Sequence, residues 1–196
     1  MKPRSEACER NRDPILEVLR QWFARPGVVL EIGSGTGQHA VYFAEHLPHL
    51  TWQPTDRQEN LDGIRAWVAE AKLANMRDPI ELDVTTKRWP ITSADYAFTA
   101  NTAHIMGWSE VELMFARLGE LLVTESVFCL YGPVNRDGQF TSESNRAFDQ
   151  MLRNRDPRMG IRDDQALFAL AARNGFTLQA DSQMPANNRL LVWKKH

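Results

Sequence analysis

The sequence predicts an α/β protein with a Rossmann-like, doubly wound sheet, and three observations support this class. Apolar runs typical of buried strands alternate with segments of helical periodicity along the 196 residues. Three glycines follow the first apolar run at alternate positions. Two strand-like segments at 176–183 and 188–193 close the chain as an antiparallel pair. We expect one domain covering 1–196.

Composition narrows the class of protein further. The hydrophobic fraction of 43% and the charged fraction of 24% are ordinary for a soluble globular chain. The net charge of −2 shows no basic excess, so we expect no nucleic-acid partner. No apolar run approaches the ~20 residues of a membrane span and the first residues lack a signal peptide, so we expect a cytoplasmic protein without membrane contact. Cys8 and Cys129 have no CxxC partner, which indicates neither a disulfide nor a metal site.

The chain begins with a polar stretch, residues 1–13, before apolar residues follow at helical spacing. We expect Pro14 to open an amphipathic helix that continues to Phe23. A polar arm of this kind is usually a disordered terminus, which is the expectation for residues 1–4. Residues 5–11 are an alternative candidate for a lid over a ligand.

The glycine turn is the strongest functional signal. Val28–Ile32 is expected as a buried strand and 38–47 as a helix, so Gly33, Gly35 and Gly37 fill a tight turn between them. The spacing is G-x-G-x-G, whereas a dinucleotide site uses G-x-G-x-x-G. Glu31 would repel a pyrophosphate and attract an ammonium group. These charges favour S-adenosylmethionine (SAM) over NAD, with a plain turn and a solvated glutamate as the remaining alternative.

Two further strands are expected to end in acids. Leu50–Asp56 ends at the distance from the glycines where a carboxylate meets ribose hydroxyls, and the alternative is a helix cap. A helix over 60–75 follows. The strand 79–84 then brings Asp83 and Val84 to where an adenine ring would lie, although a turn aspartate is nearly as good an interpretation of Asp83.

The fourth strand, 94–100, delivers Asn101 and His104 beyond its carboxyl end, where open α/β sheets place their reaction sites. His104 is a candidate general base and Asn101 can orient a substrate, while a purely structural histidine is an equal alternative. Ser109 and Glu112 match a capping box at the start of the next helix, and 127–131 is the fifth strand.

An irregular, charged insertion at 134–162 follows the fifth strand. Thr141, Ser142 or Ser144 is expected to cap a helix that runs to about Arg155. Most of its charges are expected on a solvated face, but several of its polar residues can line a substrate pocket. A last helix is expected from Asp163 to the Asn-Gly pair at 174–175.

This order resembles class I SAM-dependent methyltransferases. More specific motifs are similar to a methyltransferase-like family designated domain of unknown function 938, and they span nearly the whole chain. These motifs are Glu9-Arg-Asn11, Leu30-Glu-Ile-Gly-Ser-Gly-Thr-Gly-Gln-His39, Gln53-Pro-Thr-Asp56, Asn101-Thr-Ala-His-Ile105, Gly132-Pro133, Gly138-Gln-Phe-Thr-Ser-Glu-Ser-Asn145, Arg155-Asp-Pro-Arg158, Gly160-Ile-Arg-Asp163 and Met184-Pro-Ala-Asn-Asn188.

The resemblance implies a seven-stranded sheet and SAM as the cofactor. Glu31 and the first glycines would hold its methionine portion, Asp56 its ribose and Asp83 its adenine, with Asn101 and His104 beside the transferred methyl. The implied cofactor residues are Glu31, Gly33, Ser34, Gly35, Gly37, Asp56, Arg57, Asp83, Val84 and Asn101. The implied pocket residues are Arg10, Asn11, Asn135, Glu143, Asn145 and Asn187.

We therefore expect a methyltransferase that acts on a small molecule or a protein side chain. The loop after the fourth strand lacks the D/N-P-P-Y/F run typical of enzymes that methylate adenine or glutamine amides. A non-catalytic SAM-binding or scaffold protein is one alternative, and an NAD-dependent oxidoreductase is another. The sequence leaves the acceptor and the oligomeric state open.

Overall fold

A computed structural model describes residues 2–196. They form two compact units, one running to Thr99 and the other covering Ala100–His196. Seven strands are ordered β3-β2-β1-β4 in the first unit and β5-β9-β8 in the second. This strand set, with its antiparallel C-terminal strand, confirms the predicted fold class. A single domain over 1–196 remains a prediction.

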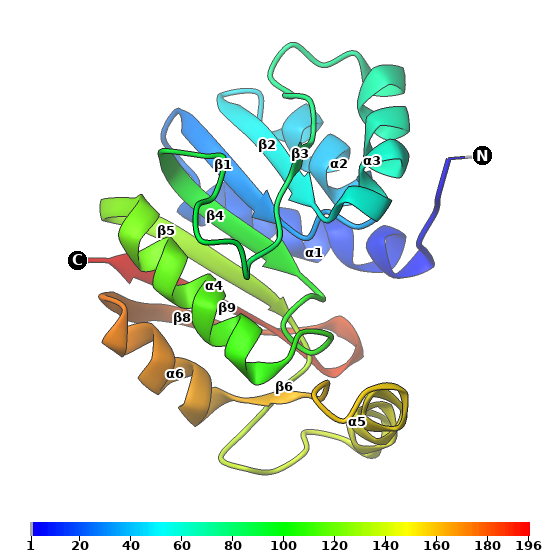
Figure 1. The fold of residues 1–196 in the computed structure, drawn as a ribbon, viewed down its shortest axis with the longest axis vertical. Coiled ribbons are helices and arrows are strands. Elements are labelled where there is room, and N and C mark those ends of the chain that lie inside the picture. The colour runs from blue at the N-terminus through cyan, green and yellow to red at the C-terminus, as the bar shows by residue number, and fades with distance from the viewer. Residues whose placement is uncertain (1) are drawn as a thin grey trace. The chain divides into compact units, whose positions relative to one another are not determined.

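The first unit is a parallel sheet with its helices. It contains α1 (Glu6–Trp22), β1 (Gly27–Ile32), α2 (Gln38–His46), β2 (Leu50–Asp56), α3 (Gln58–Ala71), β3 (Ile80–Glu81) and β4 (Ala94–Ala100). β1 pairs in parallel with β2 and with β4, and β2 pairs in parallel with β3. The carboxyl ends of these strands therefore share one edge, which carries Asp56 and the glycine turn. α2 contacts β2 and α3 (Figure 1).

Aromatic side chains fill the core of this unit. The rings of Phe43 and Trp52 lie 5.6 Å apart between centroids, and those of Phe43 and Phe98 lie 5.4 Å apart. All three side chains are fully buried. Because β1, β2 and β4 are covered by this packing, most of their residues are buried, including polar residues of β2 such as Gln53 and Thr55.

Helix α1 differs from the prediction. It begins at Glu6 rather than at Pro14, which lies inside the helix. A proline inside a helix removes one hydrogen bond of the helix, but contacts made by the residues just before α1 offset this loss. Trp67 Nε1 donates to the carbonyl of Pro3 at 2.8 Å, and Lys2 Nζ lies 3.4 Å from the Trp67 ring centroid. The expected disorder is thus wrong for residues 2–4, and Met1 lies outside the described residues.

Other boundaries shift as well, such as that of α3, which covers Gln58–Ala71 rather than 60–75. β3 covers two residues rather than 79–84, because it pairs only with the end of β2 and Asp83 then begins a turn. Helix α4 begins at Trp108, where the Gly107 N–H donates to Glu110 Oε2 at 2.6 Å. The predicted capping box at Ser109 and Glu112 is therefore wrong by two residues, because this glycine takes the position before the helix.

The second unit carries an antiparallel sheet. It contains α4 (Trp108–Leu121), β5 (Leu122–Gly132), β6 (Val134–Asn135), α5 (Glu143–Arg155), β7 (Arg162–Asp163), α6 (Asp164–Arg173), β8 (Phe176–Met184), a 3-10 turn (Pro185–Asn187) and β9 (Asn188–Lys195). β9 pairs antiparallel with β5 and with β8, which confirms the predicted hairpin. Phe128 stacks on Trp193 at 5.4 Å and meets Phe115 edge-on at 5.3 Å. α4 and α6 lie side by side (Figure 1).

Helices α5 and α6 begin where the sequence indicated. Ser142 caps α5, since its hydroxyl accepts from the Asn145 N–H at 3.1 Å. Asp163 caps α6 by accepting from the Gln165 N–H at 3.1 Å. Gly175 follows α6 with φ +77°, the left-handed conformation typical of a helix end.

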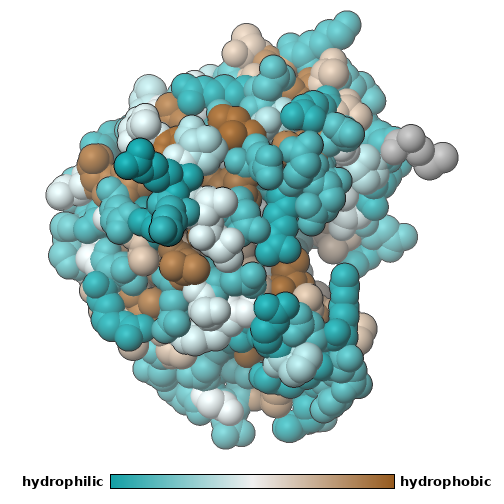
Figure 2. All heavy atoms as spheres, in the orientation of Figure 1, coloured by the Kyte–Doolittle hydropathy of each residue, from teal (hydrophilic) through white to brown (hydrophobic). Residues whose placement is uncertain are grey.

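The surface is mostly hydrophilic on the face drawn in Figure 2. Within residues 2–196, four large apolar side chains are exposed: Ile105, Leu113, Val123 and Met151. None of the helices within residues 2–196 combines the length and the apolar character that crossing a membrane requires.

Candidate functional site

The turn between β1 and α2 requires its glycines. Gly33, Gly35 and Gly37 have φ values of +72°, +57° and +88°, a region that L side chains rarely adopt. A Cβ on Gly37 would also lie 3.1 Å from the Ile64 Cα, whereas a Cβ on Gly35 would meet nothing within 4 Å. The last glycine is thus needed for packing against α3, and the middle one faces open space.

This difference yields a stability prediction. Gly37→Ala is expected to lower the free energy of unfolding by about 2 to 3 kcal/mol, because it adds a close contact to the cost of a positive φ. Gly35→Ala is the matched control and is expected to cost about 1 kcal/mol, from φ alone. Urea unfolding measures both, and equal losses would contradict the contact with Ile64.

The backbone N–H groups of this turn donate hydrogen bonds to oxygen atoms of the protein itself. The Ser34 N–H donates to the Thr55 carbonyl at 2.9 Å, and the Gly37 N–H donates to the Ser34 carbonyl at 2.9 Å. The Gly35 N–H donates to Asp56 Oδ2 at 2.7 Å. A phosphate-binding turn directs such N–H groups at its anion. Here these N–H groups donate to protein oxygens, so the turn has few N–H groups left to bind an anion.

Glu31 is a buried carboxyl group at the end of β1, with only 1% of its surface exposed. Its Oε2 accepts from Trp52 Nε1 at 3.0 Å and from Ser34 Oγ at 2.9 Å. Burial raises the pKa of Glu31 to about 7, an effect that these hydrogen bonds oppose and the nearby Asp56 charge reinforces. Its Oε1 accepts no hydrogen bond from any part of residues 2–196. This oxygen is a ready acceptor for a cation.

Asp56, the acid at the end of β2, organises the same edge. Oδ1 accepts from the Arg57 N–H at 2.7 Å and from Asn60 Nδ2 at 2.9 Å, while Oδ2 holds the Gly35 N–H. A carboxylate has about four acceptor positions, so hydroxyl groups of a ligand can still be bound. Sequence reasoning found Glu31 and Asp56 but missed Trp52 and Asn60, whose roles depend on side-chain direction.

Asp83 follows β3 in a turn. Its Oδ1 accepts from the Thr85 N–H at 2.8 Å and from the Thr85 hydroxyl at 2.7 Å, and these bonds lower its pKa. Arg57 Nε lies 3.4 Å from its Oδ2. The turn interpretation therefore describes its local geometry, and the adenine contact stays a prediction. Val84 beside it is buried.

In the second unit, Asn101 and His104 lie around Gly132. A Cβ on this glycine would lie 3.7 Å from His104 Nδ1 and 3.8 Å from Asn101 Oδ1. Asn101 adopts φ +57°, an unusual conformation for a residue with a side chain, and its N–H donates to the Tyr131 carbonyl at 2.9 Å. Both side chains thus lie beside the same glycine, and their predicted place beside the transferred methyl group stays a prediction.

His104 is 6% exposed and packs edge-on against Phe148 at 5.2 Å. Burial, with a smaller effect from the Arg162 charge, lowers the pKa of His104 to about 4. The ring is therefore neutral at physiological pH, and its two nitrogens make no hydrogen bond within residues 2–196. A neutral imidazole can orient a polar group, but it is a weaker base than an exposed histidine.

The lowered pKa predicts acid sensitivity. The unfolded chain binds a proton at His104 below about pH 6.5, whereas the folded chain does so only near pH 4. Stability from this residue is therefore full above pH 6.5 and falls by about 3 kcal/mol as the pH drops to 4. His104→Gln should flatten this part of the stability curve, measured by urea unfolding between pH 4 and 7. An unchanged slope would contradict the lowered pKa.

The predicted pocket residues of the insertion at 134–162 make hydrogen bonds or ion pairs mainly with other residues of the second unit. Asn145 Nδ2 donates to Thr141 Oγ1 at 2.9 Å and to the Asn187 carbonyl at 3.0 Å. Glu143 lies on the exposed first turn of α5, with Arg146 Nε 3.4 Å from its carboxylate. These contacts tie α5 to the turn before β9, so a substrate role for the three predicted residues remains a prediction.

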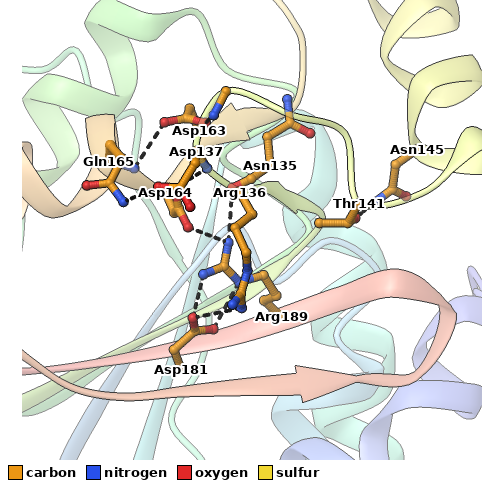
Figure 3. Close-up of polar contacts among 11 residues, drawn as sticks. Asn135, Arg136, Asp137, Thr141, Asn145, Asp163, Asp164, Gln165, Asp181 and Arg189 are labelled. Atoms are coloured by element: carbon orange, nitrogen blue, oxygen red, sulfur yellow. Dashed lines mark hydrogen bonds and ion pairs between the residues drawn. The ribbon is translucent and has the colours of Figure 1, made fainter.

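A buried ion network lies beside them, as Figure 3 shows. Arg189 donates to Asp164 Oδ2 and to the Asn135 carbonyl, both at 3.0 Å, and pairs with Asp181. Arg189 and Asp164 are nearly inaccessible to solvent. Asn135 Oδ1 is buried and accepts no hydrogen bond within the described chain. Sequence reasoning missed this network because its members are far apart in the chain.

The two predicted pocket residues on α1 differ in environment. Arg10 is exposed and lies 3.3 Å from Glu6. Asn11 is buried and holds His39 Nε2 at 2.7 Å. No group of three or more histidine, cysteine, aspartate or glutamate side chains within residues 2–196 is placed to hold a metal ion.

A family model described as "Protein of unknown function (DUF938)" matches residues 2–195. Among solved structures, an O-methyltransferase family protein from Burkholderia thailandensis has a TM-score of 0.82 at 15% identity, over 93% of this chain and 55% of that one.

Two further structures show the same fold. An O-methyltransferase family 2 protein from Planctomyces limnophilus DSM 3776, in complex with apigenin, has a TM-score of 0.82 at 13% identity, over 95% of this chain and 57% of that one. CalO1, a methyltransferase in calicheamicin biosynthesis in its SAH-bound form, has a TM-score of 0.75 at 16% identity, over 94% and 54%. The chain thus spans about half the length of the structures that it matches.

Proposed function

The chain belongs to the family described as "Protein of unknown function (DUF938)" and has a methyltransferase fold, and from this we propose that it is a SAM-dependent methyltransferase. Its acceptor is a small molecule or a protein side chain. The proposal rests on one observation. Oε1 of buried Glu31 accepts no hydrogen bond within residues 2–196, and it lies beside a glycine turn whose N–H groups already donate to protein oxygens.

The chemistry of this edge fits SAM better than a dinucleotide. SAM contributes an ammonium, ribose hydroxyls and an electrophilic methyl group on a sulfonium, and it carries no phosphate. Glu31 would hold the ammonium, and Asp56 would accept from the hydroxyls. The two carboxylates would repel a pyrophosphate, which also finds few free amide groups in this turn.

Asn101 and His104 would bind and orient the methyl acceptor. Methyl transfer is an in-line displacement, so the protein has to align the nucleophile and exclude water. We assign Asn101 and neutral His104 to hydrogen bonds with the acceptor. His104 would take a proton only late in the reaction, since its pKa of about 4 makes it a weak base.

Small-molecule acceptors are supported by the neighbours. One neighbour is solved with apigenin, and another acts in calicheamicin biosynthesis. The test is to incubate the protein with SAM carrying a labelled methyl group, together with fractionated small molecules and proteins. A labelled product that disappears in Asp56→Ala supports the proposal. SAM binding without any labelled product would instead favour the non-catalytic alternative.

Asp56→Ala gives a quantitative prediction for binding. Loss of a carboxylate that accepts from ribose hydroxyls is expected to weaken SAM binding at least about tenfold. Asp62→Ala is the matched control, because this exposed carboxylate on α3 pairs with exposed Arg65 at 2.9 Å. Calorimetry measures both affinities, and equal values for both variants would reject Asp56 as a cofactor residue.

A further inference from the structure

A second cluster of reactive side chains lies in the first unit, outside the residues assigned to SAM. Cys8 Sγ lies 3.9 Å from His39 Nδ1, and His39 Nε2 lies 2.7 Å from Asn11 Oδ1. Cys8 and Asn11 come from α1, and His39 comes from α2. Stacking on Phe43 at 5.2 Å fixes the plane of the imidazole.

The protonation of His39 follows from its partner. Asn11 Oδ1 can only accept, so His39 Nε2 carries the proton. Nδ1 then presents its lone pair to the thiol. Cysteine nucleophiles with a histidine base and an asparagine on the second ring nitrogen recur among thiol hydrolases, and they are recognised by this order of contacts.

The position of Cys8 adds donors for a developing negative charge. Cys8 lies in the first turn of a 17-residue helix whose N-cap, Ser5, makes no side-chain cap. The Ser5 side chain thus binds none of the N–H groups of that turn, and the helix dipole favours negative charge there. Gln38 is buried, with Oε1 held by the Ser5 N–H and by Thr36 Oγ1 at 3.1 Å. Its Nε2 makes no hydrogen bond within residues 2–196.

A cavity of about 220 Å³ adjoins this cluster. Cys8 and Gln38 both line it, with Tyr42 and Trp67 as aromatic walls and Arg4 and Arg12 among its charged residues. A nucleophile and an amide donor thus border one space large enough for a small acyl group and part of its leaving group.

We propose that Cys8, His39 and Asn11 form a second reactive site, in which the Cys8 thiol takes an acyl group from a small ester or thioester. Cys8 is the nucleophile, His39 is the base and Asn11 is a positioning residue. The three residues differ from those assigned to SAM, but burial and then the charge of Glu31 raise the pKa of the Cys8 thiol, so the two sites adjoin.

The step balances as an acyl transfer. Cys8 Sγ bonds to the carbonyl carbon while its proton passes to His39 Nδ1, and the bond from that carbon to the leaving alcohol or thiol breaks. The leaving group takes the proton from the imidazolium. Water, deprotonated by His39, then attacks the thioester, which releases a carboxylic acid and restores the thiol.

His39 is a weak base, as His104 is, so it takes the thiol proton only while Sγ bonds to the carbonyl carbon. Burial raises the pKa of the Cys8 thiol and lowers the pKa of His39 to about 4. The pair at rest is therefore a neutral thiol and a neutral imidazole. Without the base, such a thiol would react more slowly than a free one.

The experiment compares the rate of acylation of Cys8, assisted by His39, with that of a free thiol that has no base beside it. The full chain, without SAM, is mixed at pH 7 with p-nitrophenyl acetate, and the release of p-nitrophenolate and the acetylated residue are measured. We expect one equivalent to be released in a rapid phase, an acetyl group on Cys8, and a rate above that of N-acetylcysteine under the same conditions. Cys129→Ser should behave as the wild type, because Cys129 is fully buried.

Variants separate the roles. Cys8→Ser should lose the rapid phase, and His39→Gln should slow it about a hundredfold. Asn11→Ala should slow it less, and Asn11→Gln should restore part of the rate. Acetylation elsewhere, or a rate for Cys8 at or below that of N-acetylcysteine, would overturn the proposal from wild-type protein alone, even if a variant fails to fold. Because the assay contains no SAM, its outcome is separate from that of the methyltransferase proposal.

Discussion

Glu31→Gln is expected to make the protein more stable at pH 8 while it removes SAM binding. The pKa of about 7 in the folded chain lies above the ordinary value of 4.5, so burying the ionised form costs free energy. The contribution of Glu31 to stability is fully present below pH 4.5 and is lost as the pH rises through 7. The neutral amide avoids this loss, and we expect a gain of about 3 kcal/mol at pH 8.

Binding should change in the opposite direction. An ionised Glu31 pairs with the ammonium group of SAM, whereas glutamine cannot supply the charge, so we expect a loss of at least about a hundredfold in affinity. In the wild type the affinity should fall about tenfold per pH unit below 7, because the carboxyl group has to lose its proton first. The glutamine variant should lack this dependence.

Glu81→Gln is the matched control. Glu81 also lies at the carboxyl end of a strand of this sheet, but its side chain is exposed. We expect no change in affinity and a change in stability within about 0.5 kcal/mol. A Glu31→Gln variant that keeps its SAM affinity, or that unfolds more easily at pH 8, would remove Glu31 from the cofactor site.

Arg189→Met is expected to cause the largest loss of stability, about 3 to 5 kcal/mol. Arg189 is only 3% exposed, and Asp164 opposite it is 4% exposed. Removing the guanidinium leaves that carboxylate buried without its counter-charge and frees the Asn135 carbonyl. The turn before β9 and the start of α6 are expected to loosen together.

Arg136→Met separates this network effect from a general loss of charge. Arg136 lies 3.3 Å from Asp181, a carboxylate that it shares with Arg189, but it is half exposed. Its loss should therefore cost less than about 1 kcal/mol. Urea unfolding at pH 7 measures both variants. Similar losses for the two arginines would show that the buried position of Arg189 contributes little.

The sequence predicted the fold because its central strands are buried on both faces. β1 is almost entirely apolar, β2 and β4 carry large buried side chains such as Trp52 and Phe98, and turns or glycines end all three strands. The start of α1 was mispredicted, since the helix depends on contacts of Pro3 with Trp67 and of Asn11 with His39. Such contacts between distant residues leave no local signal.

Part of the candidate site was predictable from the sequence, as part of the fold was. Glu31, Asp56 and the three glycines have a fixed spacing around a strand end, so their shared edge follows from sequence. Trp52 donates to Glu31 from within β2, where it is indistinguishable in sequence from an ordinary core residue. The pKa of Glu31 depends on its complete burial, which only the folded chain reveals.

The central claim is that the glycine turn and Glu31 form a site for a cation beside an adenosine. Calorimetric titration of the wild type with SAM at pH 7, in buffers of different ionisation enthalpy, tests it most directly, with NAD as the competitor. We predict that SAM binds, that binding releases protons as Glu31 ionises, and that NAD does not bind. Binding of NAD, or no heat with SAM at saturating concentration, would contradict the account.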